Sequence, residues 1–198
     1  MTKAEKTRQY IIEQTAYLFN TKGASATSLS DITEATGLTK GSIYGNFKNK
    51  DEVALAVFEH NANIVYREIK KCIYKENQTQ KERLLAIVTL YRTEWKMFFE
   101  QGGCPLLNAA TEADDTFPVL KHSVIKTFEG LANIFTKIIE KGIQTKEFKA
   151  NIDRETYAYL FISLIEGGML LGKTTGQIKH LYNSLDRIAH IIESEITA

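Results

Sequence analysis

The sequence predicts an all-α protein. Apolar residues recur at steps of three and four along most of the 198 residues, which is the period of a helix with one buried face. No long stretch alternates apolar and polar residues at period two, and the chain contains only 2 prolines, which would interrupt helices. Because 43% of the residues are hydrophobic, the chain can bury a substantial core as one long or two short domains. We expect nine helices and no strands.

The amino-terminal helix is expected over 2–22, where apolar side chains recur on one face and Gly23 ends the pattern. A long helix is expected from about 50 to 74, because Asn49 can cap it and acidic residues occupy its first turn. Asp153 can cap a later helix. The helices that follow the long one are expected over 80–101, 106–113, 114–142, 153–172 and 175–196.

The stretch 27–47 predicts two short helices joined by a tight turn. Gly37 ends the first of them, and Thr39 opens the second. The apolar positions expected to face inward are Leu29, Ile32, Ala35, Ile43 and Phe47. Two short helices around a turn that contains glycine form a helix-turn-helix.

The outward positions of the second short helix are small, basic or hydrogen-bonding: Lys40, Gly41, Ser42, Tyr44, Gly45 and Asn46. Such a surface suits a helix that enters the major groove of DNA. The charge distribution agrees, since 1–50 hold seven Lys/Arg and four Asp/Glu, net +3, whereas 51–198 hold eighteen and twenty, net −2. Lys3, Lys6 and Arg8 are interpreted as solvated surface charges, with phosphate contact as the alternative.

Nine residues are candidate DNA contacts. Of Thr27 and Ser28, one is expected to cap the first short helix and the other to bind a phosphate. Lys40 can reach a guanine edge or a phosphate, and Tyr44 suits a phosphate because a phenol on a short exposed helix has little core to enter. The full set is Thr27, Ser28, Thr39, Lys40, Gly41, Ser42, Tyr44, Asn46 and Lys50.

Several of these residues belong to a longer pattern. It consists of Thr27-Ser28, Asp31-Ile32, Ala35, the run GLTKGSIYGNF from Gly37 to Phe47, and Lys50-Asp51. The pattern resembles the DNA-binding domain of the TetR/AcrR family of one-component bacterial regulators. Gly45 departs from it, because many members have His or Tyr at this position, and one base or phosphate contact is then absent or made differently.

The resemblance implies a homodimeric repressor that binds a palindromic operator in double-stranded DNA. It implies a nine-helix fold with the helix-turn-helix domain over 1–50 and a ligand-binding and dimerisation domain over 51–198. A specific base contact contributes about 1–3 kcal/mol, so one reading helix binds weakly, and the family gains affinity from two half-sites roughly 34 Å apart.

The resemblance also implies release of the operator when a small-molecule or electrophile inducer binds, through movement of the helix over 53–74. No cofactor is implied. Activation of transcription instead of repression stays open. So does a small-molecule-binding or thiol-redox sensor with a vestigial DNA-binding domain, which would show no salt-dependent specific binding to DNA.

The last two helices carry apolar stripes that are wider than one buried face needs. One interpretation is that these stripes are core within one chain. The resemblance to the family favours the other, a four-helix bundle between two subunits, in which Gly167-Gly168 would allow close helix approach. The first stripe includes Tyr157, Leu160, Ile165 and Leu171. The residues expected at the dimer interface are Phe161, Leu164, Gly168, Leu181, Leu185, Ile188 and Ile192.

The middle helices are rich in aromatic residues with polar residues between them. Any one aromatic residue at helical spacing is more often plain core, but the set suits an apolar cavity with a few polar anchors. The expected ligand-binding residues are Asn61, Tyr91, Trp95, Phe98, Cys104, Asn108, Phe128 and Glu166.

Two interpretations of Cys104 stay open. It follows Gly102-Gly103 and precedes Pro105 just ahead of a helix, where the helix dipole can lower the pKa of a thiol and make it reactive toward electrophiles or oxidants. A glycine-cysteine pair at this point is also similar to a subgroup of the family in which reactive cysteine sensors occur. The alternative is a small buried residue in a tight corner.

No catalytic constellation or metal site is indicated. The histidines, His60, His122, His180 and His190, lack metal-ligand spacing. Asp114 and Asp115 look like the start of a helix and not like a paired acid and base. Cys72 and Cys104 do not form a disulfide framework, and there is no apolar leader and no apolar run of about eighteen residues. The sequence therefore predicts a cytosolic protein with no membrane partner.

Overall fold

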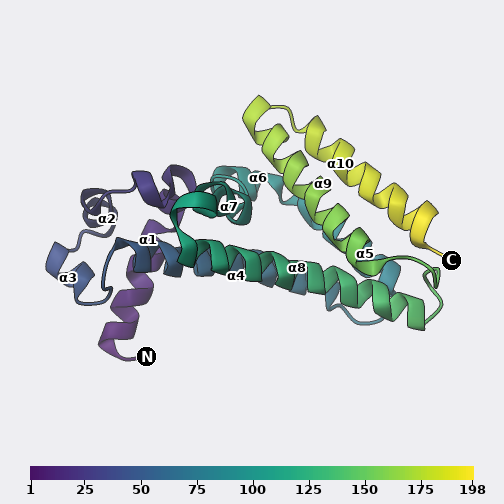
Figure 1. The fold of residues 1–198 in the computed structure, drawn as a ribbon, viewed down its shortest axis with the longest axis horizontal. Helices are drawn as coiled ribbons and strands as arrows, with labels where there is room; N and C mark the ends of the chain where they lie inside the picture. Colours follow the sequence, from purple (N-terminus) through teal and green to yellow (C-terminus); the bar gives the residue numbers. More distant parts are fainter. The chain divides into compact units, whose positions relative to one another are not determined.

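The computed structural model describes residues 1–198 except for the side chains of residues 114–116. It divides into two compact units, one formed by 1–64 and 101–126 and the other by 65–100 and 127–198. The predicted all-α fold class is confirmed, since the described residues form helices and no strand (Figure 1). Phe148 and Thr197 form an isolated β-bridge.

The first unit begins with three helices that are each capped by a hydroxyl side chain, two of them as predicted. In α1 (Lys3–Ala26), Thr2 and Glu5 cap each other's backbone, and Gly23 breaks the helix with φ 82° and ψ 166°. In α2 (Leu29–Thr36), Ser28 caps the first turn, and Gly37 ends the helix with φ 67°, a left-handed conformation that glycine adopts at no steric cost. The third helix, α3 (Lys40–Tyr44), is one turn long and is capped by Thr39.

A compact apolar core holds these three helices together. Ile11, Ile32 and Ile43 are fully buried. Further core members are Phe19, Phe47, Val53, Ala54 and Val57. Ala35, which the sequence placed inward, is exposed. Thr36 takes the inward position, and its hydroxyl donates to the Ile32 carbonyl at 2.8 Å, so the hydroxyl is satisfied without water.

Two long helices, α4 (Lys50–Ile73) and α8 (Pro118–Gln144), each contribute residues to both units. Asn49 caps α4, because its Oδ1 accepts from the Glu52 amide at 2.9 Å. The first unit also contains α7 (Pro105–Thr116), which follows two glycines in left-handed conformations, Gly102 and Gly103. The helix-start role expected for Asp114 and Asp115 lies outside the described residues.

The second unit contains α5 (Gln80–Thr93), α6 (Trp95–Glu100), α9 (Arg154–Thr175), α10 (Lys179–His190) and the terminal π-helix η1 (Ile191–Ile196). The single helix expected over 80–101 is divided at Glu94 into α5 and α6, which together occupy that one place in the nine-helix order. Asp153 caps α9 as predicted.

The helices α9 and α10 lie side by side (Figure 1). A Cβ atom on Gly168 would lie 2.9 Å from Ser184 Oγ and 3.0 Å from Leu181 Cα, so glycine permits this close approach. No helix among the described residues combines the length and apolarity that crossing a membrane requires.

Candidate nucleic-acid interface

The single-turn helix α3 has one buried face and one exposed face. Ile43 and Phe47 are buried in the core of the first unit. Lys40 and Gly41 are exposed, and 47% of Tyr44 is accessible to solvent. The predicted inward positions of α3 are therefore the observed ones, and of the predicted outward positions Lys40, Gly41, Tyr44 and Gly45 are exposed.

Ser42 and Asn46 are half-buried on α3 and just after it. The Asn46 side-chain amide donates to the Ser42 carbonyl at 2.9 Å, and Thr39 accepts from the Ser42 amide at 3.2 Å. A Cβ atom on Gly45 would lie 3.2 Å from the Gly41 carbonyl. These local contacts fix the outline of the exposed face.

The expected division of roles between Thr27 and Ser28 is half right. Ser28 caps α2, since its hydroxyl accepts from the Asp31 amide at 3.1 Å and donates to the Asp31 carboxylate at 2.8 Å. Thr27 is fully buried, and its hydroxyl donates to the Gly23 carbonyl at 2.6 Å. The phosphate contact expected of the Thr27 side chain is therefore wrong, because the broken end of α1 uses its hydroxyl.

Lys50 begins α4 as expected, but its ammonium is engaged within the protein. It donates to the carbonyls of Ser25 and Thr27 at 3.2 and 2.8 Å. A negatively charged side chain binds the same segment: the Glu112 carboxylate of α7 accepts hydrogen bonds from the amides of Ala24 and Ser25. Two charged side chains from different helices thus hold the connection between α1 and α2.

Electrostatic contacts also hold α2 in place. Lys22 and Asp31 form an ion pair at 2.6 Å. The hydrogen bond from Lys22, followed by those from the Ser28 amide and hydroxyl, lowers the pKa of Asp31 to about 2. The carboxylate therefore stays ionised at neutral pH and anchors the first turn of α2.

Arg8 was interpreted from the sequence as solvated surface charge, and the structure corrects this. Its guanidinium donates to the Asn46 carbonyl at 2.7 Å, forms an ion pair with Glu52 at 3.0 Å and lies 4.0 Å from the centroid of the Phe47 ring. Asn46 and Phe47 come just after α3, and Glu52 lies in the first turn of α4. Nothing in the sequence distinguishes Arg8 from Lys3 or Lys6, because its partners are 38 or more residues away.

Three expected ligand-binding residues lie in the first unit, where their polar groups serve the fold. The Asn61 amide donates to the Ala16 carbonyl at 3.2 Å. The Asn108 amide donates to the backbone and side-chain oxygens of Asn20 and to the Gly102 carbonyl, at 3.0 to 3.1 Å. Cys104 directly precedes α7 and is buried. Its burial favours the interpretation that this thiol serves packing.

The other expected ligand-binding residues lie in the second unit, mostly within packed side chains. The rings of Tyr91 and Phe98 stack with centroids 5.2 Å apart and are buried. Trp95 makes an edge contact with Phe99 at 5.3 Å and is half-buried. The last two members of the set are Phe128, which is half-buried, and Glu166, which is buried.

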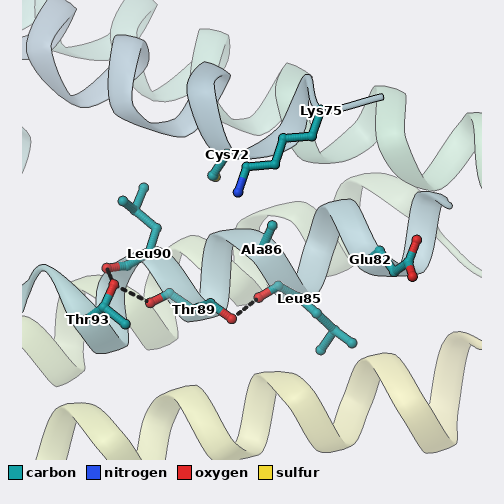
Figure 2. Close-up of a pocket in the computed structure, with 8 residues that line it drawn as sticks. All are labelled: Cys72, Lys75, Glu82, Leu85, Ala86, Thr89, Leu90 and Thr93. Carbon is teal, nitrogen blue, oxygen red and sulfur yellow. Dashed lines mark hydrogen bonds between the residues drawn. The ribbon is translucent and has the colours of Figure 1, made fainter. Parts of the chain in front are cut away.

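A hollow of about 360 Å³ is found between the end of α4 and the outer face of α5 (Figure 2). It is lined by Cys72, Lys75, Glu82, Leu85, Ala86, Thr89, Leu90 and Thr93. None of the eight expected ligand-binding residues is among them. Burial raises the pKa of the Cys72 thiol to about 11, so this sulfur is protonated at neutral pH and is a weak nucleophile.

The residues expected at the dimer interface are mostly buried within one chain, and this part of the prediction needs correction. Phe161, Gly168, Leu181, Leu185, Ile188 and Ile192 are all buried in the packing of the second unit. Gly168 in particular serves the contact of α9 with α10 of the same chain. Of the predicted set, Leu164 alone keeps partial exposure.

A different face of α9 is apolar and exposed. We call Leu160, Leu164, Gly167 and Leu171 the α9 stripe; they follow one another at steps of four, three and four residues and therefore share one side of the helix. Leu160 is 37% exposed and Leu171 51%. A Cβ atom on Gly167 would have no neighbour within 4 Å.

The exposed face of α3, in a helix-turn-helix joined to a helical carboxy-terminal part, defines the class as DNA-binding transcriptional regulators. Two family models match the chain. The model of bacterial regulatory proteins of the tetR family matches residues 11–57, and the model of the tetracyclin repressor-like C-terminal domain matches residues 81–188. Since the second match alone covers more than half of the chain, this protein belongs to the TetR family of transcriptional regulators.

Individual proteins agree with this assignment. A TetR-family transcriptional regulator from Cytophaga hutchinsonii has a similar crystal structure, with a TM-score of 0.94 and 39% identity over 100% of this chain and 98% of that one. The transcriptional regulator AcrR of Shigella flexneri is 40% identical over 57 residues, which is 29% of this chain and 26% of that protein. The transcriptional repressor DhaR of Mycobacterium sp. (strain GP1) is 23% identical over 164 residues, 82% of this chain and 80% of that protein.

Proposed function

We propose that this regulator is a repressor that binds a palindromic operator as a homodimer and is released by a small-molecule inducer. The observation that carries the proposal is the exposed face of α3. Its core-facing side is fixed by Ile43 and Phe47, while Lys40, Gly41 and Tyr44 lie open to solvent. A helix N-terminus with an exposed lysine and phenol suits phosphate oxygens and guanine edges.

The proposed DNA contacts are revised by the burial of the candidates. Lys40, Gly41, Ser42, Tyr44 and Asn46 belong to the reading face, and Ser28 and Thr39 stand at the N-termini of α2 and α3. Thr27 is excluded because it is buried. Lys50 supports the connection between α1 and α2 through two carbonyls, so a phosphate contact would use its remaining N–H.

The proposed dimer forms through the α9 stripe. Steps of four, three and four residues are the spacing of helices that pack with a small crossing angle. Gly167 lets a second helix approach closely, and the flanking leucines supply the apolar surface that association removes from water. The occupant is a second copy of this chain, in agreement with the dimers of its family.

Release by an inducer is proposed to act through α4, which contributes residues 50–64 to the first unit and 65–73 to the second. An inducer that binds the second unit and prefers a different spacing of the two reading helices lowers operator affinity by its differential binding. Moving the equilibrium from 99:1 to 1:99 takes about 5.5 kcal/mol of preference. We keep the functional boundary at 50/51 as a prediction, although the compact unit that holds the reading helix extends to residue 64 and includes 101–126.

The experiment that tests the repressor proposal starts from a random library of DNA duplexes. The purified protein should enrich a sequence with two inverted half-sites, and its affinity for that sequence should fall steeply as salt rises. A reporter gene with the selected sequence overlapping its promoter should then be repressed by the protein. Binding without sequence preference, or activation of the reporter, would contradict the proposal.

A further inference from the structure

Arg8 makes three different contacts with the residues that follow the reading helix. Its Nη1 atom donates to the Asn46 carbonyl at 2.7 Å and lies 3.0 Å from Glu52 Oε1. The central carbon of the guanidinium, Cζ, lies over the Phe47 ring, 4.0 Å from the ring centroid. A planar group with several N–H donors can make such a combination of contacts, whereas an ammonium cannot.

The segment that Arg8 contacts is short, and Arg8 adds to the burial of Ile43 and Phe47 in holding it. The helix α3 has five residues, Lys40–Tyr44, and an isolated helix of this length is unstable in water. Its last turn is closed by the bonds from the amides of Asn46 and Phe47 to the Ile43 carbonyl, both 3.0 Å. The guanidinium adds a positive charge near the C-terminal end of α3, the end at which a helix dipole favours a cation.

Glu52 presents its carboxylate to Arg8 from the first turn of α4. The carboxylate accepts from the Lys48 amide at 2.8 Å, and the Glu52 amide is held by Asn49 at 2.9 Å. The hydrogen bond from the Lys48 amide, and with it Arg8, lowers the pKa of Glu52. Arg8 thus connects α1 to the end of α3 and the start of α4 through a fixed and ionised partner.

We infer that Arg8 is a positioning residue for operator recognition, which holds the reading helix in register through the Asn46 carbonyl and the Phe47 ring without binding DNA itself. The inference rests on the proposed function. Its alternative is a phosphate contact, because the side chain is 37% exposed and has N–H donors beyond those used here. The two roles differ in salt dependence and in sequence specificity.

The test compares wild type, Arg8→Ala, Arg8→Lys and the matched control Lys6→Ala, which removes a charge from an exposed position of the same helix. Each binds the duplex that the wild type selects and a scrambled duplex of equal length, over a range of salt. Arg8→Ala should lose roughly tenfold to hundredfold affinity for the selected duplex, as expected for a lost charged hydrogen bond. Its salt slope should equal that of wild type, and its affinity for the scrambled duplex should match that of Lys6→Ala.

Arg8→Lys keeps the charge but loses the guanidinium contact with the Phe47 ring. It should therefore also bind the selected duplex more weakly than wild type. This variant provides the comparison if Arg8→Ala does not fold. The opposite result would be a dependence of log affinity on log salt that is shallower in Arg8→Ala by about 0.9 for each subunit, with equal losses of affinity for both duplexes. That result would overturn the inference in favour of a phosphate contact. Equal affinity of all four proteins would overturn it as well.

Hydrogen exchange of the protein alone separates this inference from the proposed function. The amides of Asn46 and Phe47 should exchange faster in Arg8→Ala than in wild type, and Lys6→Ala should leave them unchanged. Unchanged exchange in Arg8→Ala would overturn the positioning role. Failure of the wild type to select any duplex would instead overturn the proposed function.

Discussion

At the scale of residues, the same kind of side chain serves different purposes according to what surrounds it. Tyr44 is open to solvent on α3, whereas the hydroxyl of Tyr10 donates to the Thr36 carbonyl at 3.0 Å. Arg8 and Lys6 are two residues apart, and only Arg8 is recorded in contact with the end of α3. Because Tyr10 is 42% exposed and Tyr44 47%, contacts and not exposure distinguish a supporting residue from a candidate recognition residue.

Replacing Tyr44 with alanine tests the reading face directly. We expect Tyr44→Ala to weaken operator binding at least roughly hundredfold, because a dimer loses two hydrogen bonds to charged phosphates, each about 1.5–3 kcal/mol. The fold should be unchanged, since the side chain packs little. Tyr17→Ala is the control, because Tyr17 is 56% exposed in the same unit. Equal affinities of the two variants, measured by gel shift, would count against the groove assignment.

The acid dependence of stability tests the anchor of α2. The pKa of Asp31 is lowered from 3.8 to about 2 in the folded protein, so its ion pair and cap stabilise the fold above pH 3.8. That contribution is lost as pH falls toward 2. Melting temperatures should therefore decline more steeply between pH 4 and 2 in wild type than in Asp31→Asn. Glu34→Gln, an exposed change on the same helix, should follow wild type, and parallel curves for all three proteins would contradict the account.

At the scale of elements, capping chemistry made the start of four helices predictable, α2, α3, α4 and α9. Thr39, Asn49 and Asp153 occupy the expected cap positions. The division of the expected helix over 80–101 at Glu94 was not predictable, because apolar spacing continues across the break. The faces of α9 were misassigned for a related reason. An apolar stripe shows that a face avoids water, but not whether α10 of the same chain or a second chain covers it.

The α9 stripe gives the element-scale prediction. Leu171→Glu should convert the dimer to monomers at micromolar concentration, because a charge in a buried apolar interface is costly unless it is paired. Sedimentation velocity measures the change. Val119→Glu is the matched control, since Val119 of α8 is a similarly exposed apolar residue, 60% accessible. Dimers that persist in Leu171→Glu would exclude the stripe as the interface.

At the scale of the whole molecule, the helix-turn-helix and the all-α class were predictable from one sequence, because their signals are local: caps, a turn glycine and helical spacing. The long-range contacts that hold the helix-turn-helix domain were not predictable. The Asn108 and Glu112 contacts with α1 join residues 87 and 88 positions apart, and no local pattern marks them. The expected ligand set stays a prediction, since none of its residues lines the hollow beside α5 and aromatic spacing alone does not distinguish a packed cluster from an open one.

The central claim is that two copies of this chain read one operator. Sedimentation equilibrium of the protein with the selected duplex tests it most directly, using duplexes that carry both half-sites or only one. We expect two chains on the full duplex, with half-sites about one helical turn apart, and much weaker binding to the single half-site. One chain on the full duplex, with the same affinity for both DNAs, would contradict it.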